Sequence, residues 1–275
     1  MRLLGVCLLV QVLTGSIILQ DPEQQRQDRT PIVLWHGMGD SCCNPFSMGS
    51  VINLLQEKIP GVYVLSLMIG SNVIQDTENG FFMNINDQIS EACSTIRNDS
   101  RLTGGFHAVG FSQGGLFLRG LVQRCGDLKV RNLVSIGGPQ QGVYGLPHCL
   151  GEDHTICDYI RRLLNYGAYT SWIQRLLVQA QYWHDPRAEE EFSEKSLFLA
   201  DINNQGEKMN PEYPLNLEKL ENLLLVKFSR DSMVDPKDSE WFGWFDPADG
   251  LTILPFNQTK LYTQDRIGLR KLDTV

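Results

Sequence analysis

The sequence predicts an α/β fold in which a mostly parallel, doubly wound sheet carries a helical cap insertion. Three observations favour it. Short apolar runs alternate with amphipathic stretches along most of the chain, which is typical of a parallel sheet. One of these runs passes through a glycine-rich turn directly into a helical pattern. Between about residues 139 and 222 the alternation gives way to short helical patterns, which indicates an insertion.

The elements follow in chain order. Strands are expected at residues 30–34, 62–67, 106–111, 133–136 and 223–228, and helices at 44–57 and 84–93. A further helix follows residue 112, where Leu116, Leu118, Leu121 and Val122 stand in helical register. Within the insertion, residues 158–165 and 171–181 are expected to be helical. The cap's apolar faces are expected to include Leu163, Trp172, Ile173, Leu176 and Leu177.

The first 29 residues are predicted to lie outside the folded domain. Residues 1–16 read as a signal peptide, with Arg2 ahead of an apolar run and small residues behind it. That run is too short for a transmembrane segment. Residues 17–29 are polar, and the domain is expected to occupy residues 30–275.

Residues 110–114, Gly-Phe-Ser-Gln-Gly, predict a nucleophile elbow centred on Ser112. An apolar strand precedes the pattern and a helix follows it, which is the context that the chemistry requires. The glycines two residues before and after the serine relieve the crowding of a very tight turn. Ser112 is therefore the predicted nucleophile of an α/β-hydrolase. The alternative is a glycine-rich turn with an incidental serine.

Two backbone N–H groups are predicted to form the oxyanion hole. Residues 30–34 run into Trp-His-Gly-Met-Gly, a glycine-rich loop of the kind that supplies one donor, and Met38 is the predicted residue. The second donor is Gln113, directly after the nucleophile. His36 in the same loop precedes the serine, whereas the base of this fold comes last in the chain. We interpret His36 as a structural residue.

The triad acid is predicted in the turn after residues 223–228, where a Ser…Asp…His series places its carboxylate. Asp231 and Asp235 are the candidates. Asp231 follows the strand immediately and is preferred, while Asp235 precedes a proline and is expected to shape the turn. The aromatic residues 241–245 favour buried packing, with a membrane-facing lip as the alternative.

Composition excludes several classes of function. The net charge of −8 argues against nucleic acid as a partner. No Cys-x-x-Cys pair or cluster of histidines indicates a metal site, and no cofactor is expected. Without Cys7 in the signal peptide, six cysteines remain, which favours disulfides in a secretory route over six free thiols. Asn98 and Asn257 occupy glycosylation sequons.

Several longer motifs give the chain a close resemblance to the type-1 lysosomal palmitoyl-protein thioesterases. They are WHGMGDSCCNP, GFSQGG, HCLGEDHTICDYIR, QAQYWHDP, FLADIN, DSMVDPKDSEWFG and LYTQDRIGL, and the resemblance extends from about residue 31 to 269. It implies hydrolysis of long-chain acyl thioesters on cysteines of lipidated proteins during lysosomal degradation. The implied substrates are S-acylated proteins or peptides and acyl thioesters. The lysosome is the implied location, with secretion as a further destination.

The resemblance also implies residue roles. Ser112 would be the nucleophile, Asp231 the acid, and Met38 and Gln113 the oxyanion donors. The implied disulfides join Cys42 to Cys43, Cys93 to Cys125, and Cys149 to Cys157.

The catalytic base is the point of departure from the family. The five histidines, at positions 36, 107, 148, 154 and 184, all precede Asp231, whereas the family's catalytic histidine follows the acid. The resemblance implies that the last strand, this histidine and the closing helix are missing from residues 1–275. The alternative function is therefore a catalytically impaired chain that binds acyl groups without turnover. A different serine esterase or lipase is a third hypothesis, against which the longer motifs count.

Overall fold

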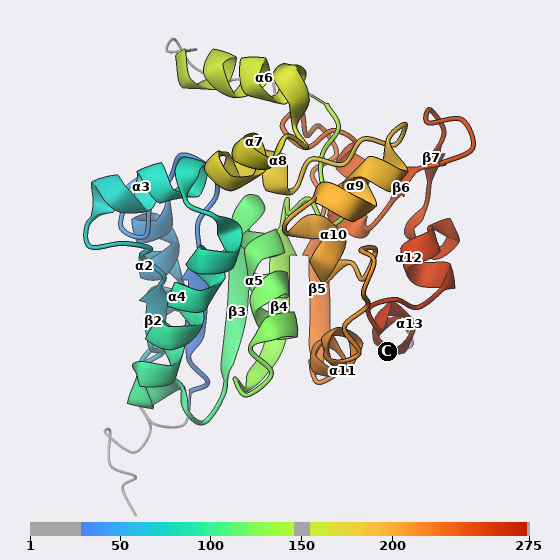
Figure 1. Ribbon diagram of the computed structural model, residues 1–275. Coiled ribbons are helices and arrows are strands. Elements are labelled where there is room, and N and C mark those ends of the chain that lie inside the picture. Colours follow the sequence, from blue (N-terminus) through green and yellow to red (C-terminus); the bar gives the residue numbers. More distant parts are fainter. Residues whose placement is uncertain (1–28, 146–154, 274–275) are drawn as a thin grey trace, which may run out of the picture.

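A computed structural model describes residues 29–145 and 155–273, and a five-stranded sheet lies at its centre (Figure 1). The order across the sheet is β2-β1-β3-β4-β5, and all neighbouring strands run parallel, which confirms the predicted fold class. The strands are β1 (Ile32–Trp35), β2 (Val64–Ser66), β3 (Phe106–Phe111), β4 (Val130–Ile136) and β5 (Asn222–Val226).

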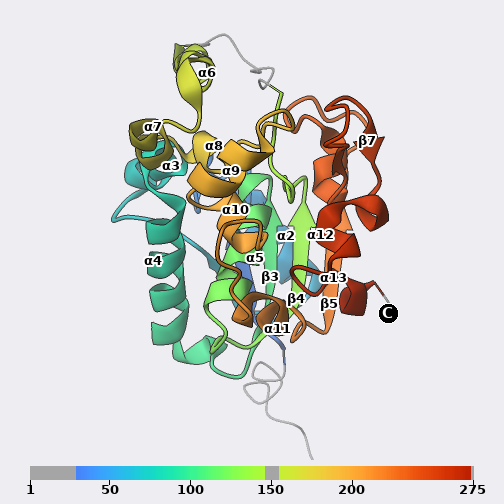
Figure 2. The same cartoon turned by 45° about the vertical axis from the view of Figure 1, so that its right-hand side comes forward.

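Helices cover both faces of the sheet because the residues of β1 alternate between two apolar clusters. Ile32 and Leu34 pack with Met48 of α2 (Met48–Lys58) on one face. Val33 and Trp35 join the larger cluster on the other face, which includes residues of α4 (Ile85–Asn98) and α5 (Gln113–Arg124). Figure 2 shows α4 and α5 in front of the sheet and α2 behind it. The sheet is therefore enclosed between two helical layers.

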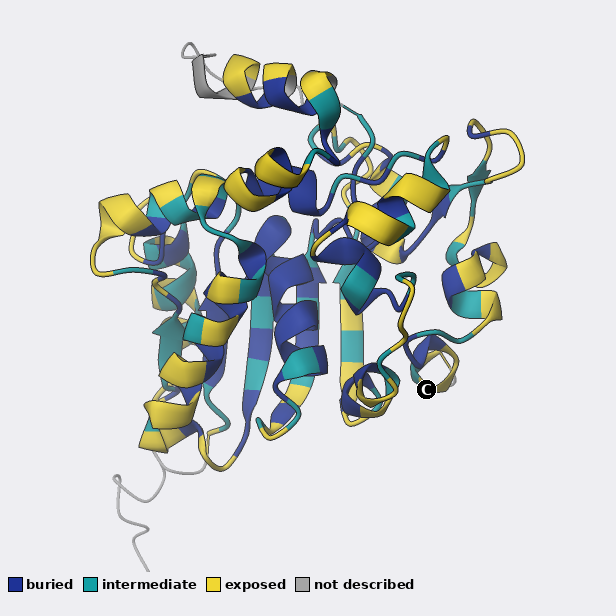
Figure 3. Ribbon diagram, viewed as in Figure 1, coloured by how far each residue is buried: buried dark blue, intermediate teal, exposed yellow. Residues whose placement is uncertain are grey.

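The core is densest around α5, which is buried along almost its whole length (Figure 3). Phe117 of this helix meets Trp35 of β1 and Phe198 of the cap edge to face, at centroid distances of 5.4 and 6.0 Å. A disulfide joins Cys93 of α4 to Cys125 at the end of α5. The helix behind the predicted nucleophile is thus fixed from three directions.

The helix α3 (Val73–Phe82) is absent from the sequence prediction, as are the short helices after residue 188. Its beginning carries a recognisable N-cap, because the side chain of Asn72 accepts hydrogen bonds from the backbone N–H groups of Ile74 and Gln75. A short 3₁₀ turn, η1 (Ser100–Leu102), follows α4.

Six helices are described between β4 and β5, outside residues 146–154. Figure 1 shows α6, α7 and α8 above the end of the sheet where β3 passes into α5, while α11 lies at the opposite end. The predicted helix over 171–181 is instead two short helices, because Leu177 between them has an extended backbone. The six are α6 (Thr155–Gly167), α7 (Ser171–Leu176), α8 (Val178–Gln181), α9 (Glu189–Lys195), α10 (Leu199–Ile202) and α11 (Glu212–Leu217).

The chain after β5 packs back against the sheet. Trp241 is 48 % exposed, but its indole N–H donates to the carbonyl of Leu225 in β5, and Phe242 and Trp244 are buried. The aromatic segment therefore serves mainly as core. The elements are η2 (Lys237–Trp241), the antiparallel pair β6 (Trp244–Phe245) and β7 (Ile253–Leu254), η3 (Phe256–Gln258), α12 (Lys260–Thr263) and α13 (Leu269–Leu272).

In the described part of the chain, no helix combines the length and apolar character that crossing a bilayer demands.

Candidate active site

The order of the strands fixes where a site can form. In a doubly wound sheet of order 2-1-3-4-5, the connections after β1 and β3 diverge, and a crevice opens at the carboxyl ends of those two strands. Met38 follows β1 and Ser112 follows β3. Both residues line one small cavity, so the topology explains why residues 74 positions apart in the sequence meet.

Ser112 stands at the sharp turn between β3 and α5, with φ 51° and ψ −125°. A positive φ is strained for a residue with a side chain and is typical of such a turn. The side chain is half-buried, and Gly37 of the β1 loop approaches it so closely that a Cβ at position 37 would lie 3.1 Å from the Ser112 Cβ. The serine hydroxyl is therefore held beside the glycine-rich loop.

The two glycines of the elbow are required by space. A Cβ on Gly110 would overlap backbone atoms of Gly114 and Gly115, and one on Gly114 would overlap the carbonyl oxygens of Trp35 and His36. Backbone atoms of a packed sheet cannot move aside cheaply.

Gly114→Ala is expected to destabilise the protein by about 1–3 kcal/mol, the usual cost of overpacking. This corresponds to a fall of about 3–10 °C in the midpoint of thermal unfolding. Gly104→Ala is the matched control, because a Cβ there meets nothing within 4 Å. Calorimetry of the two variants checks the expectation, and equal midpoints would contradict it.

Gln113 begins α5, so its backbone N–H has no acceptor within the helix. Its buried side chain is fixed on both sides: Nε2 donates to the carbonyl of Gly80 at 3.0 Å, and Oε1 accepts from the hydroxyl of Tyr182 at 3.2 Å. These contacts hold the first turn of α5 against α3 and the cap. The positive end of the α5 dipole lies at this first turn, directly after Ser112.

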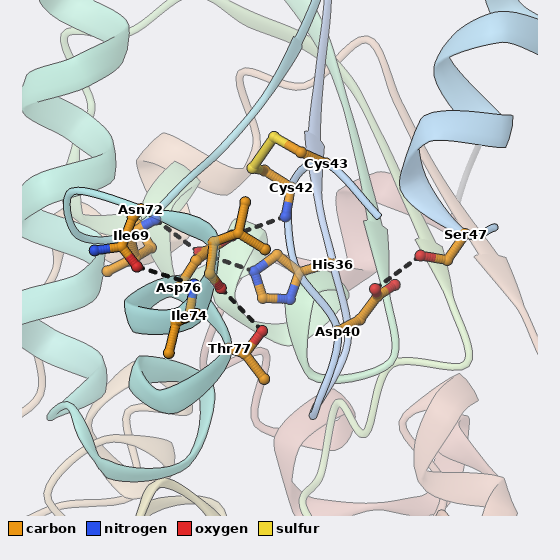
Figure 4. The surroundings of a disulfide bond; sticks show 11 residues. His36, Asp40, Cys42, Cys43, Ser47, Ile69, Asn72, Ile74, Asp76 and Thr77 are labelled. Carbon is orange, nitrogen blue, oxygen red and sulfur yellow. Dashed lines mark hydrogen bonds and ion pairs between the residues drawn. A yellow bond between two sulfur atoms is a disulfide. The ribbon is translucent and has the colours of Figure 1, made fainter. Parts of the chain in front are cut away.

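The loop that carries Met38 is anchored by a buried carboxylate (Figure 4). Asp76 of α3 accepts from His36 Nε2 at 3.1 Å, from the backbone N–H of Ile69 at 2.7 Å and from that of Cys42 at 2.7 Å. His36 Nδ1 faces the carbonyl of Gly37 at 2.9 Å. His36 is thus a structural residue of the loop, as interpreted from the sequence.

Both ring nitrogens of His36 face oxygen acceptors, which favours the imidazolium form. Burial lowers the pKa of His36, but the hydrogen bond and the charge of Asp76 outweigh it, so the pKa lies above its ordinary value. The pair is almost completely buried. It fixes the loop beside Ser112 with a charged contact.

Asp231 lies in the turn after β5 but does not line the cavity at Ser112. Its Oδ1 accepts from the backbone N–H groups of Met233 and Val234 at 2.6 and 2.8 Å, and these two residues do line that cavity. Asp235 shapes the turn: its carbonyl accepts from Tyr144 and Gly145, and its peptide bond to the next proline is cis.

The three histidines among the described residues are bonded elsewhere. His36 pairs with Asp76, His107 Nδ1 faces the Asn132 amide at 2.8 Å, and His184 bridges the carbonyl of Gln141 and the carboxylate of Glu189. His148 and His154 lie outside the described residues.

The cavity itself has a volume of about 40 Å³, which is room for a few water molecules. Of the expected cap residues, Leu163, Ile173 and Leu177 pack within the cap, and Trp172 and Leu176 are partly exposed. None of the five lines the cavity. Helical spacing marks an apolar face but does not show which neighbour it meets. The lining, beside Met38 and Ser112, consists of Pro139, Val143, Ile160, Leu164, Gln179, Tyr182, Met233 and Val234.

A family model described as palmitoyl protein thioesterase matches residues 31–275. The chain belongs to this family. Three thioesterase relatives extend the comparison. "Palmitoyl-protein thioesterase 1" of Caenorhabditis elegans is 54 % identical over 244 residues, 89 % of this chain and 81 % of that protein. "Palmitoyl-protein thioesterase 3" of Dictyostelium discoideum is 35 % identical, over 88 % and 80 % of the two chains. "Lysosomal thioesterase PPT2" of Homo sapiens is 28 % identical, over 98 % and 88 %.

Two of the three expected disulfides of this thioesterase lie among the described residues. The structure joins Cys42 to Cys43, beside the Asp76 anchor, as well as Cys93 to Cys125. The expected pair of Cys149 and Cys157 falls outside the described side chains.

The two sequon asparagines, Asn98 at the end of α4 and Asn257 in η3, are exposed. Within residues 29–145 and 155–273, no three His, Cys, Asp or Glu side chains are grouped as metal ligands would be.

Proposed function

We propose that this member of the palmitoyl protein thioesterase family hydrolyses the thioester between a long-chain acyl group and a cysteine of an S-acylated protein or peptide, with Ser112 as the nucleophile. The observation that carries the proposal is the placement of Ser112 at the end of β3, on a strained turn, inside an apolar cavity. The family match supplies the chemistry of the substrate.

The reaction would proceed in two steps. The Ser112 hydroxyl transfers its proton to a base while its oxygen attacks the thioester carbonyl, and the resulting oxyanion is stabilised by the N–H groups of Met38 and Gln113. The carbon–sulfur bond breaks and the thiolate leaves with a proton. Water then attacks the acyl-serine, and the fatty acid is released as the serine regains its proton.

The base is proposed to come from outside the described residues, because the three described histidines are bonded elsewhere. Asp231 would orient it from the turn after β5. The candidates within the given sequence are His148 and His154. Unchanged turnover in both His148→Gln and His154→Gln would exclude them.

The acyl chain would extend beneath the cap, where Ile160 and Leu164 of α6 face the cavity. Ligand sites of this kind enclose roughly 300–1,000 Å³, far more than the 40 Å³ present. We therefore expect α6 to shift when substrate binds. Each CH₂ that is then buried contributes about 0.8 kcal/mol, which favours long chains over short ones.

The proposal is tested with three substrates: a palmitoyl thioester and an acetyl thioester of the same thiol, and the palmitoyl ester of the corresponding alcohol. We expect kcat/KM for the palmitoyl thioester to exceed that of each other substrate by at least about tenfold, or about 1.4 kcal/mol. Equal rates for both palmitoyl compounds would favour a general esterase. Binding of palmitoyl thioester without turnover would favour the non-catalytic alternative.

We further propose that the chain reaches the lysosome through the secretory pathway, with residues 1–16 as its signal peptide and the cap over about residues 139–222. The name of the human relative and the exposed sequon asparagines support this location. Sedimentation of the tagged protein with lysosomal markers would test it.

A further inference from the structure

A buried carboxyl group lies behind the turn that carries the proposed triad acid. Glu240 of η2 is 1 % exposed, and its Oε2 accepts the backbone N–H of Phe228 at 3.1 Å, just after β5 ends. Its Oε1 is buried and finds no N–H or O–H donor in the described part of the chain. Burying an ionised carboxylate with one donor is costly, so this group favours a proton.

The neighbour that can use this proton is Asp231, which lies at the same turn: its backbone N–H donates to the carbonyl of Phe228 at 3.2 Å, and the N–H of that same Phe228 is the one that Glu240 accepts. Burial raises the pKa of Glu240 to about 7, although the Phe228 N–H lowers it, and the charge of Asp231 raises it further. Lys227 also faces Glu240 and lowers its pKa, but its Nζ is bonded to Asp238 at 2.8 Å. A protonated Glu240 beside a charged Asp231 can donate its O–H to that carboxylate.

The element that presents Glu240 is fixed on both sides of it. Trp241 donates its indole N–H to the carbonyl of Leu225 at 3.1 Å. Ser239 donates its hydroxyl to the carbonyl of Gly142 at 2.6 Å and accepts the backbone N–H of Gln141 at 3.0 Å. The contacts of its two neighbours with β5 and with the loop after β4 therefore fix the position of the Glu240 backbone.

We propose that Glu240 is a positioning residue for the reaction: its protonated carboxyl donates a hydrogen bond to Asp231 and fixes the orientation of that carboxylate. This inference rests on the proposed function. Asp231 Oδ1 is meanwhile held by the N–H groups of Met233 and Val234. The acid would thus be oriented from two directions, by its own turn and by η2.

The arrangement implies a pH dependence with a definite sign. Below pH about 7, Glu240 is protonated and the donated hydrogen bond is present. As the pH rises through that value, Glu240 ionises, the hydrogen bond is lost and two adjacent carboxylates repel. Because the folded pKa lies above the ordinary value of glutamate, both orientation and stability from this pair are lost on the alkaline side. We expect kcat to fall as the pH passes 7.

Glu240→Gln is the decisive variant, because its amide can accept from Phe228 and donate to Asp231 but cannot ionise. We expect it to keep kcat at pH 5 within about threefold and to lose the decline in kcat near pH 7, since one hydrogen bond is retained. Glu240→Leu removes the donor, and we expect kcat to fall by about 10²-fold with little change in KM. The matched control is Glu221→Gln, because the carboxyl of Glu221 is exposed and the residue lies just before β5.

The inference is overturned if Glu240→Gln keeps the wild-type pH profile, or if Glu240→Leu keeps wild-type kcat while remaining folded by calorimetry. The proposed function fails separately, if the wild-type protein does not hydrolyse the palmitoyl thioester. A readout independent of turnover is the carboxyl ¹³C titration of wild type and Asp231→Asn. Titration of Glu240 near the ordinary glutamate value in the wild type would also refute the protonated carboxyl.

Discussion

Replacing Ser112 by alanine is expected to lower kcat for a palmitoyl thioester by about 10⁶-fold, the typical loss when the nucleophile of a triad is removed. The residual rate would come from the oxyanion donors and from substrate binding. Alanine keeps the Cβ of the strained turn, so the backbone at φ 51° is no worse accommodated than before. The midpoint of thermal unfolding should therefore stay close to that of the wild type.

Mass spectrometry gives a second readout for Ser112. A palmitoyl thioester should leave an acyl group on the peptide that contains Ser112 in the wild type and on no peptide in Ser112→Ala. Ser94→Ala, on the exposed side of α4, is the control and should retain full turnover. Undiminished hydrolysis by Ser112→Ala would show that the reaction uses another nucleophile.

Arg119→Met is expected to have the largest effect on stability. Arg119 of α5 is completely buried, and its guanidinium donates to the side chain and carbonyl of Gln140, the side chains of Gln123 and Asn203, and the carbonyl of Ile202. Burial lowers its pKa to about 9, so the cation is costly in this position. The five hydrogen bonds, all to neutral acceptors, offset that cost.

Methionine fills a similar volume, so the variant isolates the hydrogen bonds from cavity formation. It removes the buried cation but leaves several acceptors of three segments without a donor, at about 1–3 kcal/mol each before relaxation. We expect a net loss of about 3 kcal/mol or more, or about 6–12 °C in the midpoint of unfolding. Arg97→Met, which breaks an exposed pair with Asp127, should cost no more than about 1 kcal/mol. Equal midpoints for both variants would show that the network contributes little.

The parts of the fold that could be predicted are those with a local cause. The glycines on either side of Ser112 predict the strand-to-helix turn. Apolar runs separated by helical patterns predict the parallel sheet. The helix α3 could also have been found, because Asn72 is a recognisable N-cap. The helical pattern of α3 is weak, because the helix contains Gly80 and mixes polar with apolar residues.

The rest depends on contacts between distant segments. Glu240 and Phe228 are brought together only when the chain turns after β5, so no local pattern reports the buried carboxyl. The cap shows the same limit: Ile160, Leu163 and Leu164 share one helix, but only its packing decides which of them face the cavity. The spacing of residues predicts which face of a helix is apolar, but not which segment packs against that face.

The buried contact between His36 and Asp76 has a consequence for acid tolerance. Many proteins weaken on acidification because native carboxylates must take up protons. Here the folded pKa of His36 is raised, so the contact contributes fully below the unfolded value of about 6.5 and is lost as the pH rises through the folded value. The segment that carries Met38 should therefore be most rigid in mildly acidic solution and loosen as the medium becomes alkaline.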